Sequence, residues 1–248
     1  MKRLGRSFST QQKAADEHLP LGCYRKPMTN PQIDTGKPRP IRHGGAWFEF
    51  PTVNLYAPPK TGSTTLHRYF EHNRRAYAPP LNKFTLVSWR NPIDRWISAY
   101  NMIVIYGSKR TMKENDMIER MGQGWFDRWM PDPETIDDPV GHARRFLATA
   151  QLDIESAGWE LHFCSQAHCL RRHYGEDWHN NPNIQLIPHN NWLPEIKRHT
   201  GHRITDIGNV GSYNRVPKHY YNTLRPALAK HFAEDLRIWG DVRINTTL

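Results

Sequence analysis

The order of secondary structure that the sequence predicts is its strongest constraint on the fold. Short apolar runs predict β-strands over residues 53–57, 84–89 and 184–187. Helical periodicity follows the first two of these strands, over residues 64–75 and 92–106. Strands that alternate with helices are typical of a parallel sheet with helical crossovers. We therefore expect an α/β fold in which a central parallel β-sheet is flanked by helices.

Further helices are expected along the rest of the chain. Their patterns cover residues 112–121, 140–151, 193–199 and 220–237, and Pro226 disturbs the first turns of the last one. The first 46 residues differ, because prolines at positions 20, 27, 31, 38 and 40 disfavour regular helix and central strand. We expect residues 1–46 to form an irregular, basic, proline-rich segment and residues 47–248 to form a single domain. A solvated tail is the simplest interpretation of the segment, with a transit peptide or an anion-binding arm as alternatives.

The charge balance narrows the classes of partner. The 248 residues carry 34 Lys and Arg against 24 Asp and Glu, a net charge of +10. Such an excess favours a nucleotide, a nucleic acid, an acidic glycan or a phospholipid. The longest aliphatic run, residues 102–106, is far shorter than the roughly 18 apolar residues of a membrane span. With no secretory signal after the basic start and only three cysteines, these features predict a cytoplasmic protein without a membrane anchor.

The loop after the first predicted strand has the features of an anion-binding site. Gly62 lets the backbone approach a ligand closely, and hydroxyl residues follow it at the start of a helix, where free N–H groups favour an anion. Lys60 adds a positive charge just before the turn. The loop is not a Walker A motif, in which the lysine follows the glycine, so a P-loop kinase or ATPase is disfavoured. A capped helix after a plain surface loop is the alternative. The predicted anion-binding residues are Lys60, Thr61, Gly62, Ser63, Thr64 and Thr65.

A second motif follows the second predicted strand. Arg90 stands where this strand ends, which is the ligand-binding edge of an open α/β sheet. Asn91 is suited to cap the next helix, Pro92 suits its first turn, and Asp94 occupies the place of a capping-box acid. Ser98 lies about two turns into this helix, so Arg90 and Ser98 can converge on one phosphate. An arginine near a helix cap is also common as a purely structural residue.

Both motifs resemble those of one enzyme family. The order Pro-Lys-Thr-Gly-Ser-Thr-Thr at residues 59–65 resembles the 5′-phosphosulfate loop of sulfotransferases, which use 3′-phosphoadenosine 5′-phosphosulfate (PAPS) as donor. The run Arg-Asn-Pro-Ile-Asp-Arg-Trp-Ile-Ser-Ala-Tyr at residues 90–100 resembles the 3′-phosphate motif of the carbohydrate branch, which includes the chondroitin and heparan 2-O enzymes. The resemblance implies a P-loop-NTPase-like sulfotransferase fold. It implies transfer of the sulfuryl group of PAPS to an acceptor hydroxyl, with a saccharide favoured as the acceptor.

The resemblance also implies roles for individual residues. Lys60 would stabilise the charge on the leaving phosphate oxygen, so that no metal is required, and Arg90 and Ser98 would bind the 3′-phosphate. Residues 162–166 resemble a His-x-x-x-Gln segment of the branch, in which Gln166 could simply brace a loop. Residues 209–212 resemble its Asn-x-x-Ser segment, and the basic loop that follows could close over the adenine or the 3′-phosphate. Ser212 and Arg215 are the predicted cofactor-binding residues here, and a plain surface turn is the alternative.

The general base is the weakest assignment. Many relatives carry it between the two motifs, but residues 77–80 hold neither an acid nor an imidazole. His67, Glu71 and His72 are the nearest candidates, and His67 is preferred because it lies one turn into the helix after the loop. His162 and His168 are later alternatives.

Two other interpretations compete with these. Cys164, His168, Cys169 and His173 suggest a metal cluster or a 164–169 disulfide, but their directions on one helix make a tetrahedral site awkward, and packing is favoured. A basic nucleic-acid-binding or nucleotide-binding module without catalysis would explain the charge. It would predict a Lys/Arg-rich helix or repeated aromatic-basic strands, which the sequence lacks, so no nucleic acid is expected.

Overall fold

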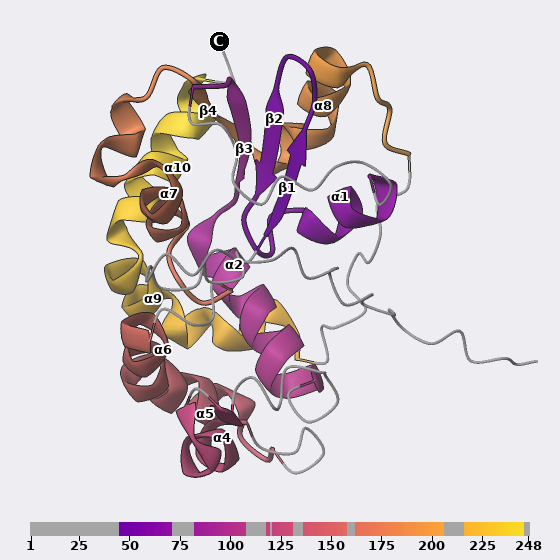
Figure 1. Ribbon diagram of the computed structural model, residues 1–248. Coiled ribbons are helices and arrows are strands. Elements are labelled where there is room, and N and C mark those ends of the chain that lie inside the picture. Colours follow the sequence, from indigo (N-terminus) through magenta and orange to yellow (C-terminus); the bar gives the residue numbers. More distant parts are fainter. Residues whose placement is uncertain are drawn as a thin grey trace, which may run out of the picture. The chain divides into compact units, whose positions relative to one another are not determined.

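The computed structural model describes residues 45–70, 82–107, 118–119, 121–130, 136–157, 162–205 and 216–245 (Figure 1). The chain divides into two units, Met1–Arg39 and Pro40–Leu248, and all described residues belong to the second unit. The predicted segment 1–46, apart from its last two residues, lies outside the described residues, as does most of the predicted helix 112–121. In the described part of the chain, no helix is both long enough and apolar enough to cross a membrane.

A four-stranded mixed sheet forms the centre of this unit. Its strands, in spatial order, are β1 (Ala46–Glu49), β2 (Asn54–Ala57), β3 (Thr85–Trp89) and β4 (Ile184–Pro188). The three strands predicted from apolar runs are confirmed, and they pair in parallel as β2-β3-β4. The sheet as a whole is mixed, because β1, which was not predicted, adds an antiparallel edge strand beside β2. A tight turn, closed by the Phe50 N–H donating to the Val53 carbonyl at 2.9 Å, joins β1 to β2, and such a short connection permits only antiparallel pairing.

Helices cover both faces of the sheet. The α-helices are α1 (Ser63–Tyr69), α2 (Pro92–Tyr100), α4 (Gln123–Trp129), α5 (Pro139–Arg145), α6 (Gln151–Ala157), α7 (Gln166–Tyr174), α8 (Trp192–Thr200), α9 (Arg225–His231) and α10 (Ala233–Asn245). Shorter helical segments are the π-helical turns Asn101–Gly107 and Phe146–Ala150 and the 3₁₀ turns Glu176–Asn180, His189–Asn191 and Lys218–Leu224. The α/β class predicted from the sequence is therefore confirmed.

Most predicted helices appear with shifted ends. The helix expected over 92–106 is α2 with its π-helical extension, and the one expected over 193–199 is α8. The single helix expected over 220–237 is divided into a 3₁₀ turn, α9 and α10, with Pro226 in the first turn of α9. Helices α4 and α7 were not predicted, and α6 continues beyond the helix expected over 140–151.

The core falls into three clusters that follow this layering. The strands β1, β2 and β3 each contribute side chains to two clusters, one with α1 and α8 and the other with α7 and α10. These two pairs of helices lie on opposite faces of the sheet (Figure 1). The third cluster packs α2 against α4, α5, α6 and α9, and we call it the helical cluster. Trp96 and Tyr100 of α2 are fully buried in it. Trp89 is also fully buried, so Trp89 and Trp96 are core residues.

Candidate functional site

Three chain segments meet at the edge where the parallel strands end. Residues 58–62 follow β2, Arg90 follows β3, and His189 follows β4. Parallel pairing brings these three carboxyl ends to the same edge of the sheet. The first two segments were predicted from the sequence to form one site, and they meet in the structure. The third segment, at His189, was not predicted.

Hydrogen-bond donors fix the orientation of the carbonyl groups in the loop. The Pro58 carbonyl accepts from the Thr61 N–H at 3.1 Å and from the Thr61 hydroxyl at 2.7 Å. The Thr61 carbonyl accepts from Ser88 Oγ on β3 at 2.7 Å and lies 3.0 Å from His189 Nδ1. A carbonyl oxygen has two lone pairs, so Ser88 and His189 can both donate to it.

Two arginines donate hydrogen bonds to the carbonyls of Pro59 and Lys60, the two residues between Pro58 and Thr61. Arg90 donates from NH1 to the Lys60 carbonyl at 2.8 Å. Arg95, which is fully buried, donates from Nε to the Pro59 carbonyl at 2.9 Å and from NH1 to the Cys164 carbonyl at 2.6 Å. Four consecutive loop carbonyls therefore face donors on the protein side.

The Gly62 N–H points the other way as a consequence of the fixed Thr61 carbonyl, whereas the Thr61 N–H donates within the turn to the Pro58 carbonyl. The N–H and C=O of a trans peptide point in opposite directions, so fixing a carbonyl also fixes the next N–H. Among the described residues, no side chain caps α1, and Gly62, Ser63, Thr64 and Thr65 have no hydrogen-bond acceptor for their N–H groups. Gly62 takes a φ of 104°, a left-handed conformation that glycine adopts without strain. The arrangement presents several amide donors to whatever occupies the space before the loop.

Lys60 supplies a cation to the same loop. It is the only non-glycine among the described residues with a positive φ, 66°. Its Nζ lies 3.2 Å from the thioether sulfur of Met102, which is a weak acceptor. An anionic oxygen would be a much stronger acceptor for this ammonium group.

Arg90 is fixed by a second set of contacts. Its backbone N–H donates to Gln166 Oε1 at 3.0 Å, and its carbonyl accepts from Gln166 Nε2 at 2.8 Å. Gln166 is fully buried, and its own N–H donates to the carboxylate of the buried Asp235 at 2.7 Å. The interpretation that Gln166 braces a loop is confirmed, and the braced residue is Arg90. Burial lowers the pKa of Arg90, so its guanidinium is held in a partly desolvated place.

The helix after Arg90 begins as predicted, with one difference. Asn91 caps α2 by accepting from the N–H groups of Ile93 and Asp94, and Pro92 lies in the first turn. Asp94, however, pairs with Arg225 of α9 at 3.3 Å. Ser98 lies half-buried two turns further along α2.

Lys218 adds a further positive charge near the start of α2. Lys218 stands close enough to Arg90 for the two charges to interact, and burial together with Arg90 lowers the pKa of Lys218. The chain that follows residues 206–215 therefore returns to Arg90. Ser212 and Arg215 themselves lie outside the described residues, as do Glu71 and His72.

The preferred base, His67, lies at the flank of α1. Its ring packs edge-on against Phe48 of the outer strand β1, with the ring centroids 5.7 Å apart. A role for His67 in proton transfer stays a prediction.

The two cysteines of the cysteine and histidine group belong to the core, while His168 and His173 are half-buried. Cys164 and Cys169 are both buried and are not joined by a disulfide, and burial raises the pKa of Cys169 to about 11. Within the described ranges, no group of three or more His, Cys, Asp or Glu side chains is placed to hold a metal ion.

Sequence reasoning missed Arg95 and His189. Burial and the nearby Arg90 charge lower the pKa of His189, which keeps its imidazole neutral near pH 7. Its position directly after the third parallel strand was the available signal, because ligand-contacting residues gather at that edge. Arg95 gave no comparable signal, since a helical arginine is ordinarily exposed.

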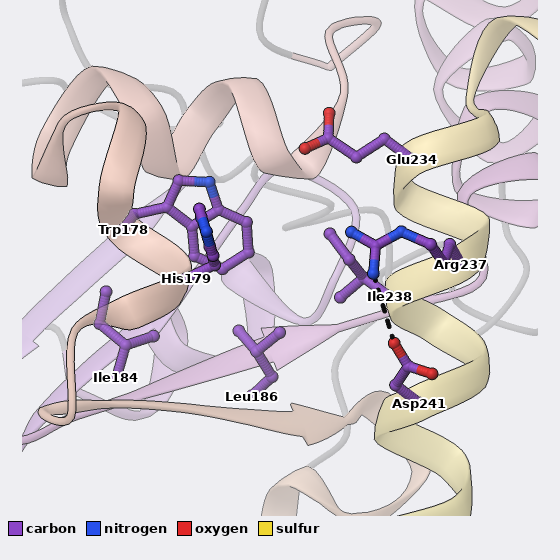
Figure 2. A pocket seen from close by; sticks show the side chains of 8 residues that line it. All are labelled: Trp178, His179, Ile184, Leu186, Glu234, Arg237, Ile238 and Asp241. Atoms are coloured by element: carbon purple, nitrogen blue, oxygen red, sulfur yellow. Dashed lines mark ion pairs between the residues drawn. The ribbon is translucent and has the colours of Figure 1, made fainter.

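A hollow of about 280 Å³ lies elsewhere, between the 3₁₀ turn Glu176–Asn180, β4 and α10 (Figure 2). Ile184, Leu186 and Ile238 point into it, and at its rim Arg237 pairs with Asp241 at 3.7 Å (Figure 2). None of its lining residues belongs to the loop or to the donors behind it. We place the candidate site at the loop, where donors of several kinds converge.

Comparison with protein-family models, with curated proteins and with solved structures found no significant match to this chain.

Proposed function

We propose that this protein is a PAPS-dependent sulfotransferase of P-loop-NTPase-like fold, which moves a sulfuryl group to an acceptor hydroxyl on a carbohydrate. The observation that carries the proposal is the hydrogen bond from Arg90 NH1 to the Lys60 carbonyl at 2.8 Å. Lys60 and Arg90 belong to the two motifs that resemble the 5′-phosphosulfate and 3′-phosphate elements of that family. Their contact supports one continuous site that would bind a nucleotide with phosphates at both positions.

The chemistry needs little beyond this arrangement. The acceptor oxygen attacks sulfur in line, an O–S bond forms, and the bond from sulfur to the 5′-phosphate oxygen breaks. The proton of the acceptor hydroxyl passes to a general base, for which His67 is the candidate. Lys60 and the amides of Gly62 to Thr65 would stabilise the negative charge that grows on that phosphate oxygen. Arg90, Ser98 and the basic residues near them would bind the 3′-phosphate, and this remote binding fixes the geometry at the reacting sulfur. In this scheme, Lys60 takes the place that a metal ion has in kinases.

Calorimetric titration with adenosine 3′,5′-bisphosphate, beside ADP and ATP without magnesium, tests the proposal. We expect a clear preference for the 3′,5′-bisphosphate. Arg90→Ala should weaken its binding by more than about 1.5 kcal/mol, roughly tenfold, because charged hydrogen bonds are lost. Arg237→Ala is the matched control, since Arg237 is exposed on α10 and pairs only with Asp241 among the described residues.

The other outcomes separate the alternatives. Equal binding of all three nucleotides, or unchanged affinity in Arg90→Ala, would contradict the assignment of the two motifs. Retention on DNA that falls steeply with salt would favour the basic nucleic-acid-binding alternative.

A further inference from the structure

His189 is fixed between the loop and the sheet. The 3₁₀ turn that begins at His189 follows β4 directly, and its ring reaches back to the loop after β2. Nδ1 lies 3.0 Å from the Thr61 carbonyl and 3.5 Å from Ser88 Oγ. A carbonyl can only accept, so the short contact requires a proton on Nδ1 when the imidazole is neutral. The contact therefore selects one tautomer of His189.

The same ring also packs against Gly62. A Cβ atom added at Gly62 would lie 3.3 Å from His189 Cε1 and 3.4 Å from Trp192 Cδ1. His189 and the buried Trp192 thus form a wall along one side of the loop at its glycine. The two rings limit the position of the Gly62 backbone on one side, and its other side would face the proposed anion.

These contacts act on one peptide unit. The Thr61 carbonyl and the Gly62 N–H belong to the same planar peptide and point in opposite directions. A donor that holds the Thr61 oxygen toward the sheet therefore turns the Gly62 N–H away from the sheet. Without such a donor, the peptide could rotate and present its carbonyl oxygen to an anion, which would repel it.

We propose that His189 is a positioning residue, whose Nδ1–H holds the Thr61–Gly62 peptide so that the Gly62 N–H faces the bound anion. The inference adds a residue to the proposed donor site and rests on that proposed function. His189 acts through the loop backbone, and Ser88 shares the task from β3.

The surroundings of His189 keep it in the required state. The groups that face it are the Thr61 carbonyl from the loop, the Ser88 hydroxyl and Arg90 charge from β3 and its end, and Trp192 from α8. Burial and Arg90 lower its pKa, so the neutral Nδ1–H tautomer is the state expected near pH 7.

Three substitutions of His189 distinguish positioning from other roles. Asparagine places an amide N–H near the position of Nδ1, whereas glutamine places it near Nε2 and alanine has none. Calorimetry with adenosine 3′,5′-bisphosphate and with inorganic pyrophosphate gives the affinities. We expect His189→Asn to bind within about threefold of wild type, and His189→Ala and His189→Gln to bind roughly tenfold more weakly.

His142→Ala is the matched control for stability. His142 is also a buried histidine whose Nδ1 makes a short contact, 2.6 Å, but its partner is Tyr100 in the helical cluster. This variant should lower stability and leave anion affinity unchanged. NMR of the imidazole nitrogens in wild type should show the Nδ1–H tautomer of His189 at pH 7, a readout that needs no ligand.

The outcomes separate this inference from the proposed function. If wild type prefers the 3′,5′-bisphosphate but His189→Ala binds it equally well, the positioning role is overturned and the donor site stands. If pyrophosphate binding depends on His189 without preference for the 3′,5′-bisphosphate, the positioning role stands and the sulfotransferase proposal fails. An Nε2–H tautomer, or an asparagine variant as weak as alanine, overturns the inference. Wild type that binds neither probe overturns both.

Discussion

Replacement of Gln166 by leucine should separate the stability of the fold from the geometry of the site. The side chain is fully buried and leucine has a similar volume, so the change creates little cavity. It removes the donor to the Arg90 carbonyl at 2.8 Å and the acceptor for the Arg90 N–H at 3.0 Å. Both groups of the Arg90 backbone then lose their partners at the end of β3.

The magnitude follows from those two groups. Each buried polar group left without a partner costs about 1–3 kcal/mol, so the free energy of unfolding should fall by roughly 2–6 kcal/mol. The Arg90 backbone also sets the direction of its guanidinium, which holds the Lys60 carbonyl. Loss of one well-aligned charged hydrogen bond to a phosphate would weaken binding by about 1.5 kcal/mol, roughly tenfold.

Gln151 offers a matched control in the same protein. It is also fully buried and uses both ends of its amide, accepting from Trp96 Nε1 at 2.9 Å and donating to the Phe163 carbonyl at 2.9 Å. These partners belong to the helical cluster and do not hold the loop or Arg90. Gln151→Leu should therefore lose a similar amount of stability and keep its affinity for adenosine 3′,5′-bisphosphate.

Urea unfolding, followed by tryptophan fluorescence, measures the free energy of unfolding. Calorimetry on the folded variants measures the affinity for adenosine 3′,5′-bisphosphate. Equal loss of stability with loss of affinity only in Gln166→Leu is the expected pattern. If Gln166→Leu binds the bisphosphate as well as Gln151→Leu does, the contact does not position Arg90 for binding. If its unfolding free energy equals that of wild type, the two hydrogen bonds contribute nothing to the fold.

Three further predictions concern the loop and pH. Lys60→Ala should lower the rate of sulfuryl transfer by about 10²-fold or more in a PAPS turnover assay, and a wild-type rate would refute its leaving-group role. Gly62→Ala should lose about 1–2 kcal/mol in urea unfolding because φ is 104°, and an unchanged midpoint would show that the loop relaxes freely. The pKa values of His142, His168 and His189 are lowered by burial from 6.5, so the fold disfavours their protonation. Their stabilisation is complete above about pH 6.5 and is lost as pH falls toward the lowered values, so unfolding free energy should drop from pH 7 to pH 5, and a rise would contradict the sign.

Local pattern was sufficient for the parallel part of the sheet. The strands at residues 54–57, 85–89 and 184–188 are short and mostly apolar. The first two are buried along their whole length, as such runs imply, and the third is buried only at its last two residues. The edge strand 46–49 was missed because four residues next to a turn give too little periodicity to separate a strand from a loop. Helix α7 was missed because its nine residues are mostly polar, with buried positions only at Gln166, Ala167, Cys169 and Leu170.

The site was predictable to the extent that its residues follow strands directly. Lys60 and Arg90 both stand at strand ends, and the rule that ligands bind at the carboxyl edge of parallel strands applies to each of them. The same rule applies to His189, once β4 is accepted as a strand of the same sheet. What the rule cannot supply is the partner of each side chain, which depends on how three separate segments pack.

Arg95 shows this limit most clearly. In the sequence it is one of two arginines in the second motif, and its place on α2 gives no reason to bury it. In the structure, Arg90 is half-buried at the edge of the sheet, while Arg95 is fully buried. The guanidinium of Arg95 donates hydrogen bonds to the Pro59 and Cys164 carbonyls. Asp235, buried nearby, interacts with its charge. Taking a guanidinium out of water costs several kcal/mol, so its hydrogen bonds to two distant carbonyls are what make that burial tolerable. Those carbonyls belong to residues 36 positions before it and 69 positions after it, and no local pattern connects them.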